Sequence, residues 1–134
     1  MSQGSPAVSK GMLWAGRVVS TLPVLMLLLS AAMKFLQPPD AVKGFEHLGW
    51  PLELSQPLGI VELVCVLLYV IPQTSVLGAI LLTGYLGGAT ATHVRIGEHA
   101  QIVGPVLAGV LVWLGLYLRD PRLRALAPWR TPLP

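Results

Sequence analysis

The chain has 134 residues, of which 54% are hydrophobic and only 11% are charged. This length allows one domain, and a soluble domain of such a size buries only about two-thirds of the surface that its unfolded chain exposes. The composition therefore excludes an ordinary soluble protein, and the net charge of +3 comes from basic residues beside apolar runs at the chain ends, which is typical of membrane orientation and not of nucleic-acid binding.

Residues 1–11 are polar and rich in small residues, which predicts a flexible N-terminal lead. An apolar run follows over about residues 12–36 and contains Arg17 and Lys34. It could be a signal peptide with its cleavage site near Ser30. We favour a retained membrane span, because the run is long for a signal peptide and three further apolar runs follow.

The polar segment between the first two apolar runs predicts a short helix at the membrane surface. Two prolines and Asp40 are typical of a helix start, and Val42, Phe45 and Leu48 share one helical face. Trp50 is expected at the depth of the lipid headgroups.

Three more spans are predicted at about residues 57–71, 75–93 and 101–118, and the second could begin nearer to residue 52. Their short connections predict an all-α, antiparallel four-helix transmembrane bundle. We expect a membrane domain over residues 12–118 and a basic, proline-rich cytoplasmic tail over residues 119–134.

The distribution of basic residues predicts the orientation of this bundle. Six lie on the side of the two termini and three on the other side. The side with more basic residues is normally cytoplasmic, so we expect a bacterial-type inner-membrane protein with both termini in the cytoplasm. The six are Lys10, Arg17, Arg119, Arg122, Arg124 and Arg130, and the three are Lys34, Lys43 and Arg95.

Ionisable groups inside apolar spans are costly unless they face a pocket or a partner, and Glu62 is the main example here. Lys34 ends the first span at the same outer level, and His93 ends the third. We infer an outward-facing polar pocket in the outer half of the bundle. Its predicted binding residues are Lys34, Glu62, Cys65, Tyr69, Thr90, His93 and Gln101, because Cys65 and Tyr69 follow Glu62 at helical spacing, Thr90 shares a face with His93, and Gln101 enters the fourth span.

Structural roles compete with this functional interpretation. Lys34 could reach the headgroups, or it could pair with Glu62 only to fix helix register. Thr90 and His93 could join helices by hydrogen bonds, and the pairs Gly84–Gly88 and Gly104–Ala108 predict close helix packing. Cys65 is the single cysteine, which excludes an intrachain disulfide and CxxC thiol chemistry. The histidine spacing predicts no metal site and disfavours haem.

Four motifs on these segments resemble the DoxX-like family of small membrane proteins over about residues 14–118. They are SAAMKF at 30–35, FEHLGWP at 45–51, GIVELVCVLLYVIP at 59–72 and GAILLTGYLGGATATHVRIG at 78–97. The resemblance implies a four-helix bundle, with Lys34, Glu62 and His93 at the lysine, acidic and polar positions of the family pattern. It differs where Ala31 or Ala32 replaces the usual glycine. Relatives are linked to a quinone-reducing thiosulfate oxidoreductase, to membrane redox complexes or to membrane-protein assembly.

Three functions are compatible with these residues. The first is a binding or accessory subunit that holds a lipophilic small molecule, such as a quinone or a lipid, in the outer pocket. The second is an isomerase or hydrolase with Glu62 as general acid or base and His93 or Lys34 as its partner. The third is an assembly partner of other membrane proteins, and the small-residue faces would also permit a homodimer.

Overall fold

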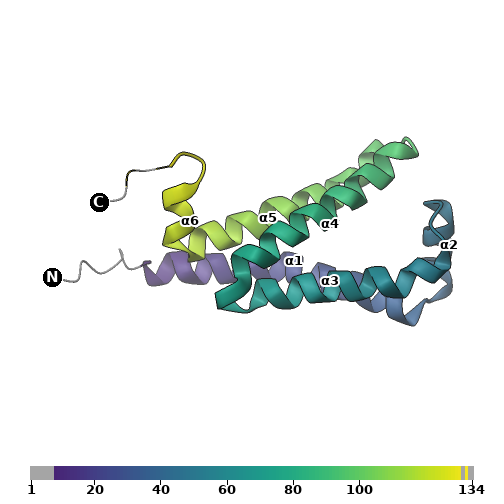
Figure 1. Ribbon diagram of the computed structural model, residues 1–134, viewed down its shortest axis with the longest axis horizontal. Helices are drawn as coiled ribbons and strands as arrows, with labels where there is room; N and C mark the ends of the chain where they lie inside the picture. Colours follow the sequence, from purple (N-terminus) through teal and green to yellow (C-terminus); the bar gives the residue numbers. More distant parts are fainter. Residues whose placement is uncertain (1–7, 131, 133–134) are drawn as a thin grey trace.

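The computed structural model describes residues 8–130 and 132, and these form a bundle of long helices (Figure 1). The predicted lead lies outside the described residues over 1–7, as do residues 131 and 133–134 of the predicted tail. The α-helices are α1 (Lys10–Leu36), α2 (Pro39–His47), α3 (Ser55–Val70), α4 (Ser75–Arg95), α5 (Val103–Arg119) and α6 (Pro121–Leu126). Short 3₁₀ turns lead into three of them: η1 (Leu52–Leu54) before α3, η2 (Pro72–Thr74) before α4 and η3 (His99–Ile102) before α5.

Within the described part of the chain, four helical segments are long and apolar enough to cross a bilayer. They are Lys10–Leu36, Leu52–Val70, Pro72–Arg95 and His99–Arg119. A chain segment in hydrocarbon must satisfy its own backbone hydrogen bonds, so these apolar runs form helices. Helix α1 packs against α3 and α5, and α4 packs against the same two helices. The antiparallel four-helix fold predicted from the sequence is confirmed, including the short helix α2 between the first two spans.

Local sequence signals define the ends of α1 and α2. Ser9 accepts a hydrogen bond from the backbone N–H of Met12 at 3.2 Å, which caps the start of α1. Gln37 ends α1 in the left-handed conformation with φ of 50°, and Pro39 then occupies the first turn of α2. The chain leaves α2 through Gly49, whose φ of 74° favours glycine.

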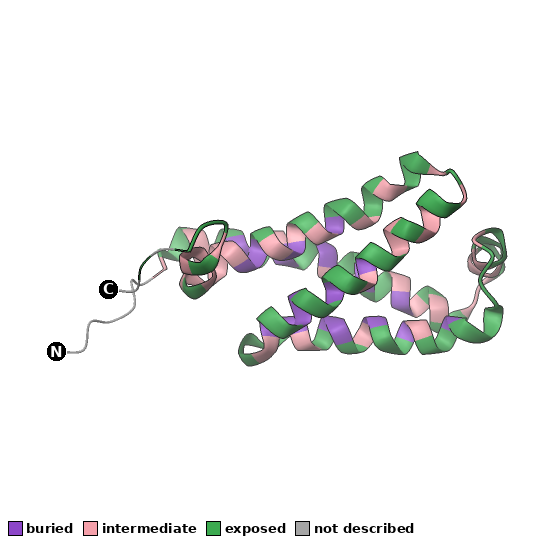
Figure 2. Cartoon of the chain, turned by 45° about the horizontal axis from the view of Figure 1, so that its top comes forward, coloured by how far each residue is buried: buried purple, intermediate pink, exposed green. Residues whose placement is uncertain are grey.

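The bundle is closed at the end that carries the termini and open at the other end. The α4–α5 pair diverges from the α1–α3 pair toward the end where α2 lies (Figure 1). Buried residues gather on the inward faces in the closed half, where Leu82, Val112 and Leu116 form part of the core (Figure 2). Exposed apolar residues such as Leu25 and Ile80 cover the outer faces, as expected where helices contact lipid.

Glycines allow the helices to approach closely in the closed half. The backbone of Tyr69 on α3 lies so near Gly78 on α4 that a Cβ atom there would overlap it. Gly16 on α1 and Gly115 on α5 make a similar contact with each other's helices. In the closed half of the bundle, these contacts bring α1 close to α5 and α3 close to α4.

The segment after the fourth span contains a helix that the sequence analysis did not predict. Helix α6 begins because Asp120 accepts a hydrogen bond from the backbone N–H of Arg122 at 2.9 Å, and Pro121 fits the first helical position. The arginines here had suggested only a basic tail.

Candidate functional site

A cavity of about 840 Å³ lies in the open half of the bundle, between α1, α2, α3, α4 and the start of α5. Most of its wall is apolar and includes Leu27, Phe45, Leu58 and Leu86. Its polar lining residues are Ser30, Lys34, Gln37, Asp40, Ser55, Glu62, Tyr85, Thr92 and His93. A cavity of this size and character is typical of sites for small lipophilic ligands.

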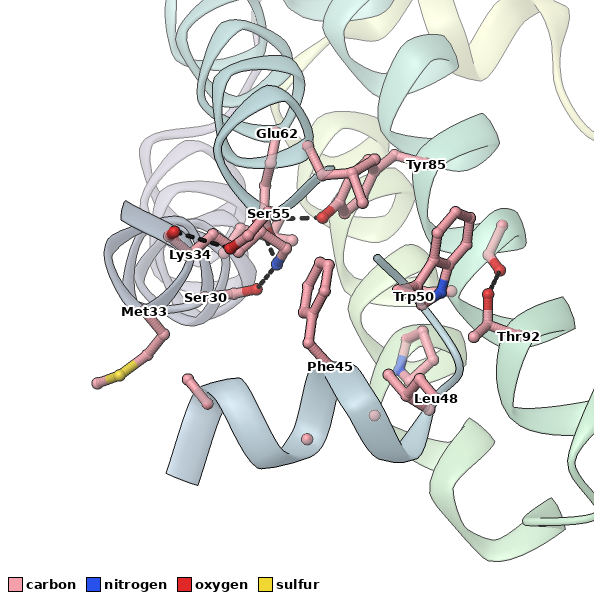
Figure 3. Close-up of a pocket in the computed structure, with 18 of the residues that line it drawn as sticks. Ser30, Met33, Lys34, Phe45, Leu48, Trp50, Ser55, Glu62, Tyr85 and Thr92 are labelled. Carbon is pink, nitrogen blue, oxygen red and sulfur yellow. Dashed lines mark hydrogen bonds and ion pairs between the residues drawn. The ribbon is translucent and has the colours of Figure 1, made fainter. Parts of the chain in front are cut away.

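An ion pair joins α1 to α3 across the cavity wall (Figure 3). Lys34 Nζ lies 2.9 Å from Glu62 Oε2, and it also donates to Ser30 Oγ at 2.7 Å. The Tyr85 hydroxyl of α4 donates to the same Glu62 oxygen at 3.1 Å. The Glu62 residue is 0% exposed, so the carboxylate that hydrocarbon would not accept alone faces the bundle interior.

The packing of α1 on α3 positions this pair. Gly59 lies one turn before Glu62, and a Cβ atom there would come within 3.1 Å of Lys34 Cβ. Ser55 Oγ donates to the Lys34 carbonyl at 2.8 Å and ties the end of α1 to the start of α3. Serine and glycine on the inward face of α3 thus allow the two helices to meet where Lys34 and Glu62 pair.

The pair leaves hydrogen-bonding capacity unused. Glu62 Oε1 is buried and has no hydrogen-bond partner among residues 8–130 and 132. An ammonium group has three N–H donors, and within the same residues Lys34 uses two of them. The ion pair thus has one unused acceptor at Glu62 and one unused donor at Lys34, on two residues that line the cavity.

Helix α2 closes the outer side of the cavity. Phe45 points from α2 toward Lys34 and Tyr85, with Trp50 beside it (Figure 3). The end of α2 is tied to the α4–α5 connection, because the Glu98 carboxylate forms hydrogen bonds with the rings of both His47 and His93, the latter at 3.3 Å.

Arg95 adds to this attachment by donating to the Leu48 carbonyl. The hydrogen bond with His47, and secondarily the one with His93, lowers the pKa of Glu98 below its ordinary value. The carboxylate therefore stays ionised over a wider range of pH than an isolated glutamate.

The structure brings together three of the residues predicted for the site and separates the other four. Lys34, Glu62 and His93 line the cavity. The remaining four do not line it, although all four lie within the described residues: they are Cys65, Tyr69, Thr90 and Gln101.

The separation has physical causes. Cys65 and Tyr69 share the inward face of α3 with Glu62, but the bundle is closed at their depth and they are buried in its core. The Tyr69 hydroxyl donates to the Val112 carbonyl at 2.7 Å. Thr90 donates to the Leu86 carbonyl of its own helix, and Gln101 lies exposed on η3.

The expected packing role of two small-residue pairs was also wrong. Gly84, Gly88 and Gly104 line the cavity, and an added Cβ atom would meet nothing within 4 Å at any of them. Ala108 is the one member of these pairs that is buried in the core. Small residues here widen the cavity instead of bringing helices together.

Sequence reasoning missed Ser30, Ser55 and Tyr85 as parts of the polar cluster. Ser30 precedes Lys34 by four residues, a helical spacing that could have indicated contact. Ser55 and Tyr85 carried no such signal, because only the mutual rotation of α1, α3 and α4 brings them to the ion pair.

Four apolar helices with a charged pair inside define a multi-pass membrane protein. The chain belongs to the DoxX-like family, which matches residues 18–115. Comparisons with curated proteins and with solved structures gave no match.

Proposed function

We propose that this membrane protein is a binding subunit that holds an apolar small molecule, a quinone or a lipid. The molecule would lie in the cavity of about 840 Å³ in the open half of the bundle, called the outer cavity from here on. Its polar head would contact Lys34 and Glu62, and its apolar body would lie against the wall near Phe45 and Leu86. The observation that carries this proposal is the buried ion pair with unused hydrogen-bonding capacity on an apolar cavity of about 840 Å³.

The unused groups favour a head with both an acceptor and a donor. The free Lys34 donor suits a carbonyl oxygen, and Glu62 Oε1 suits a hydroxyl or amide group. A quinone in its oxidised and reduced forms offers carbonyl and hydroxyl groups, and a lipid headgroup offers esters and hydroxyls. In either molecule the polar head would contact the charged pair while the apolar part fills the cavity.

The basic residues support an orientation in which this cavity faces away from the cytoplasm. Helix α1 begins and α5 ends at the closed end of the bundle, where α6 also lies, and these three helices carry four of the six arginines (Figure 1). The residues that line the cavity lie toward the opposite end. We propose a bacterial-type inner membrane as the location of the protein, where a ligand would exchange with the outer leaflet.

Binding can be tested with decylubiquinone, a short-tailed benzoquinone. Trp50 lines the cavity, so a variant with Trp14, Trp113 and Trp129 replaced by Phe would report binding through quenching of Trp50 fluorescence. Glu62→Gln in this background should weaken binding by about tenfold, the effect of losing one charge-assisted hydrogen bond. Glu53→Gln is the matched control, because Glu53 is exposed on η1 and does not line the cavity.

Lipid binding would give a different result in the same preparation. Extraction of the purified protein and mass spectrometry would then recover a bound lipid from the wild type and less of it from Glu62→Gln, while decylubiquinone fails to quench Trp50. If neither molecule binds, or if Glu53→Gln and Glu62→Gln behave alike, the binding proposal is wrong.

The free Glu62 oxygen also supports an enzyme acting on a lipophilic substrate. A carboxylate with Lys34 and Tyr85 beside it could move a proton as general base or acid, as in an isomerase or hydrolase. A bound lipid that is chemically altered during incubation with the wild type, but recovered intact from Glu62→Gln, would favour this second function.

A further inference from the structure

A second, smaller cavity of about 350 Å³ lies at the closed end of the bundle, between α1, α3 and α5. Two arginines, Arg17 and Arg119, line it together with Ser20, Thr21, Tyr69, Val24 and Val70. None of these residues belongs to the outer cavity, and the proposed function does not use them.

The Arg119 guanidinium makes one ring contact and one hydrogen bond, and it has an N–H group without a partner among the described residues. Its guanidinium lies over the ring of Tyr69, 5.3 Å from the centroid, and its Nε donates to the Gly115 carbonyl at 3.3 Å. The Nη2 atom is buried and has no hydrogen-bond partner within the described part of the chain. A buried N–H group without a partner is rare, and here it carries positive charge.

The second arginine leaves its donors available in the same way. The Arg17 guanidinium carbon lies over the ring of Trp14, 5.4 Å from the centroid. Neither arginine forms an ion pair with a carboxylate anywhere in residues 8–130 and 132. Asp120, the acidic neighbour of Arg119, instead caps α6 through the backbone N–H of Arg122.

The cavity changes from charged to apolar along α1. Arg17 lies toward the end of the bundle, Ser20 and Thr21 follow, and Val24 lies about 10 Å further into the membrane at the helical rise per residue. Val70 supplies the apolar wall from α3 and is exposed on its outer face. The polar end offers two cations without counter-charges, and the other end offers a surface for hydrocarbon.

We propose that this cavity binds the phosphate group of an anionic phospholipid, with an acyl chain lying over Val24 and Val70. Arg17 and Arg119 would donate to the phosphate oxygens, whereas the Thr21 hydroxyl already donates to the Arg17 carbonyl at 2.7 Å. Anionic lipids are the amphiphiles that basic pockets between membrane helices select at the cytoplasmic surface. Inorganic phosphate shares the head chemistry but lacks the acyl chain.

The test uses the full chain in nanodiscs of phosphatidylcholine with increasing phosphatidylglycerol whose acyl chains are brominated near the headgroup. Bromine quenches nearby tryptophan, so Trp14 beside Arg17 reports lipid occupancy in a variant with the other three tryptophans replaced by Phe. We expect saturable quenching by phosphatidylglycerol. Arg17→Gln and Arg119→Gln should each shift its midpoint about fivefold to higher lipid content, the effect of one basic residue at an anionic membrane surface.

Arg122→Gln is the matched control, because Arg122 is exposed on α6 and its substitution removes the same charge without touching the cavity. An unchanged midpoint in Arg122→Gln supports a defined site, and equal shifts in all three variants would overturn it in favour of general surface charge. Equal quenching by brominated phosphatidylcholine would also overturn the proposal, as would release of phosphatidylglycerol by inorganic phosphate at constant ionic strength. Arg17 is exposed, so its variant tests the site even if Arg119→Gln does not fold.

Discussion

At the residue scale, the buried carboxylate of Glu62 is stabilised by Lys34 and Tyr85, and each of these groups comes from a different helix. Taking a carboxylate and an ammonium group out of water is costly, and their mutual attraction offsets that cost only while both are present. The pair therefore contributes to the fold chiefly by requiring that α1 and α3 meet in one register. Under the proposed function, its unused hydrogen-bonding groups would contact the ligand.

Removing one member of this pair should destabilise the protein more than removing both. Glu62→Ala leaves the Lys34 ammonium group without its carboxylate partner and should cost about 3 kcal/mol, whereas Lys34→Met combined with Glu62→Leu should restore most of that loss. Cys65 is buried and free, so its reaction with a thiol-reactive dye during heating reports unfolding without any added probe. A double variant no more stable than Glu62→Ala would show that the two residues do not act as a pair.

The glycines of α4 should respond differently to alanine according to their surroundings. Gly78→Ala places a methyl group against the backbone of Tyr69 and should lower the melting temperature in the same dye assay. Gly87→Ala meets nothing within 4 Å and should be neutral or stabilising by up to about 1 kcal/mol, because alanine favours helix. Equal effects at the two positions would contradict the close contact between α3 and α4.

At the scale of elements, α2 lies over the outer cavity, and the contacts that hold it differ from those that hold the four spans. The spans are held together by their inward apolar faces. The end of α2 is held by polar contacts, because Glu98 binds His47 of α2 and His93 of α4, and Arg95 of α4 donates to the Leu48 carbonyl. No residue of α2 is buried. Movement of α2 would open the outer cavity without disturbing the core.

Loss of the Glu98 carboxylate should therefore loosen α2 selectively. Glu98→Gln should speed amide hydrogen exchange across Pro39–Leu48 at neutral pH. Exchange should stay unchanged in the part of α5 around Val112 and Leu116, which belongs to the core. Glu46→Gln serves as the control, since Glu46 is exposed on α2 and makes no ion pair within the described residues. Unchanged exchange in Glu98→Gln would mean that other contacts hold α2.

The pH dependence of the same attachment follows from the lowered pKa of Glu98. A depressed carboxyl pKa contributes stability that is fully present above the unfolded value and is lost as pH falls through the folded value. Acrylamide quenching of Trp50 in the single-tryptophan variant should thus stay constant through about pH 4.3, where an ordinary glutamate titrates, and rise only below it. A rise centred at or above that pH would contradict the lowered pKa of Glu98. The groups that contact Glu98 are His47 and His93, and Arg95 binds the Leu48 carbonyl nearby.

At the scale of the whole molecule, the sequence predicted the fold, offered the Lys34–Glu62 pair as one of several alternatives, and identified only some of the residues that line the cavity. Apolar runs and short connections determine the number of spans, and a glutamate within such a run indicates an inward face with a compensating partner. Helical spacing alone could not reveal that the bundle is closed at Cys65 and Tyr69, because the depth of a cavity depends on how four helices diverge. The same dependence explains why Tyr85 was missed and why Gly84 lines a cavity instead of a helix contact.

The orientation of the molecule is open to a direct test. Six of the nine basic residues lie on the side of the termini, so the C-terminus should be cytoplasmic. A green fluorescent protein fused after Pro134 should fluoresce in bacterial cells, and an alkaline phosphatase fused at the same position should be inactive. The reverse pattern would mean that the protein has the opposite orientation in the membrane, with the outer cavity on the cytoplasmic side.

The role of the open half of the bundle can be tested most directly by an experimental structure of the protein purified with its native lipids. We expect density for an amphiphile in the cavity, with its polar head within hydrogen-bonding distance of Lys34 Nζ and Glu62 Oε1. A cavity filled by ordered water alone, or a ligand whose head lies away from this pair, would contradict the proposed function.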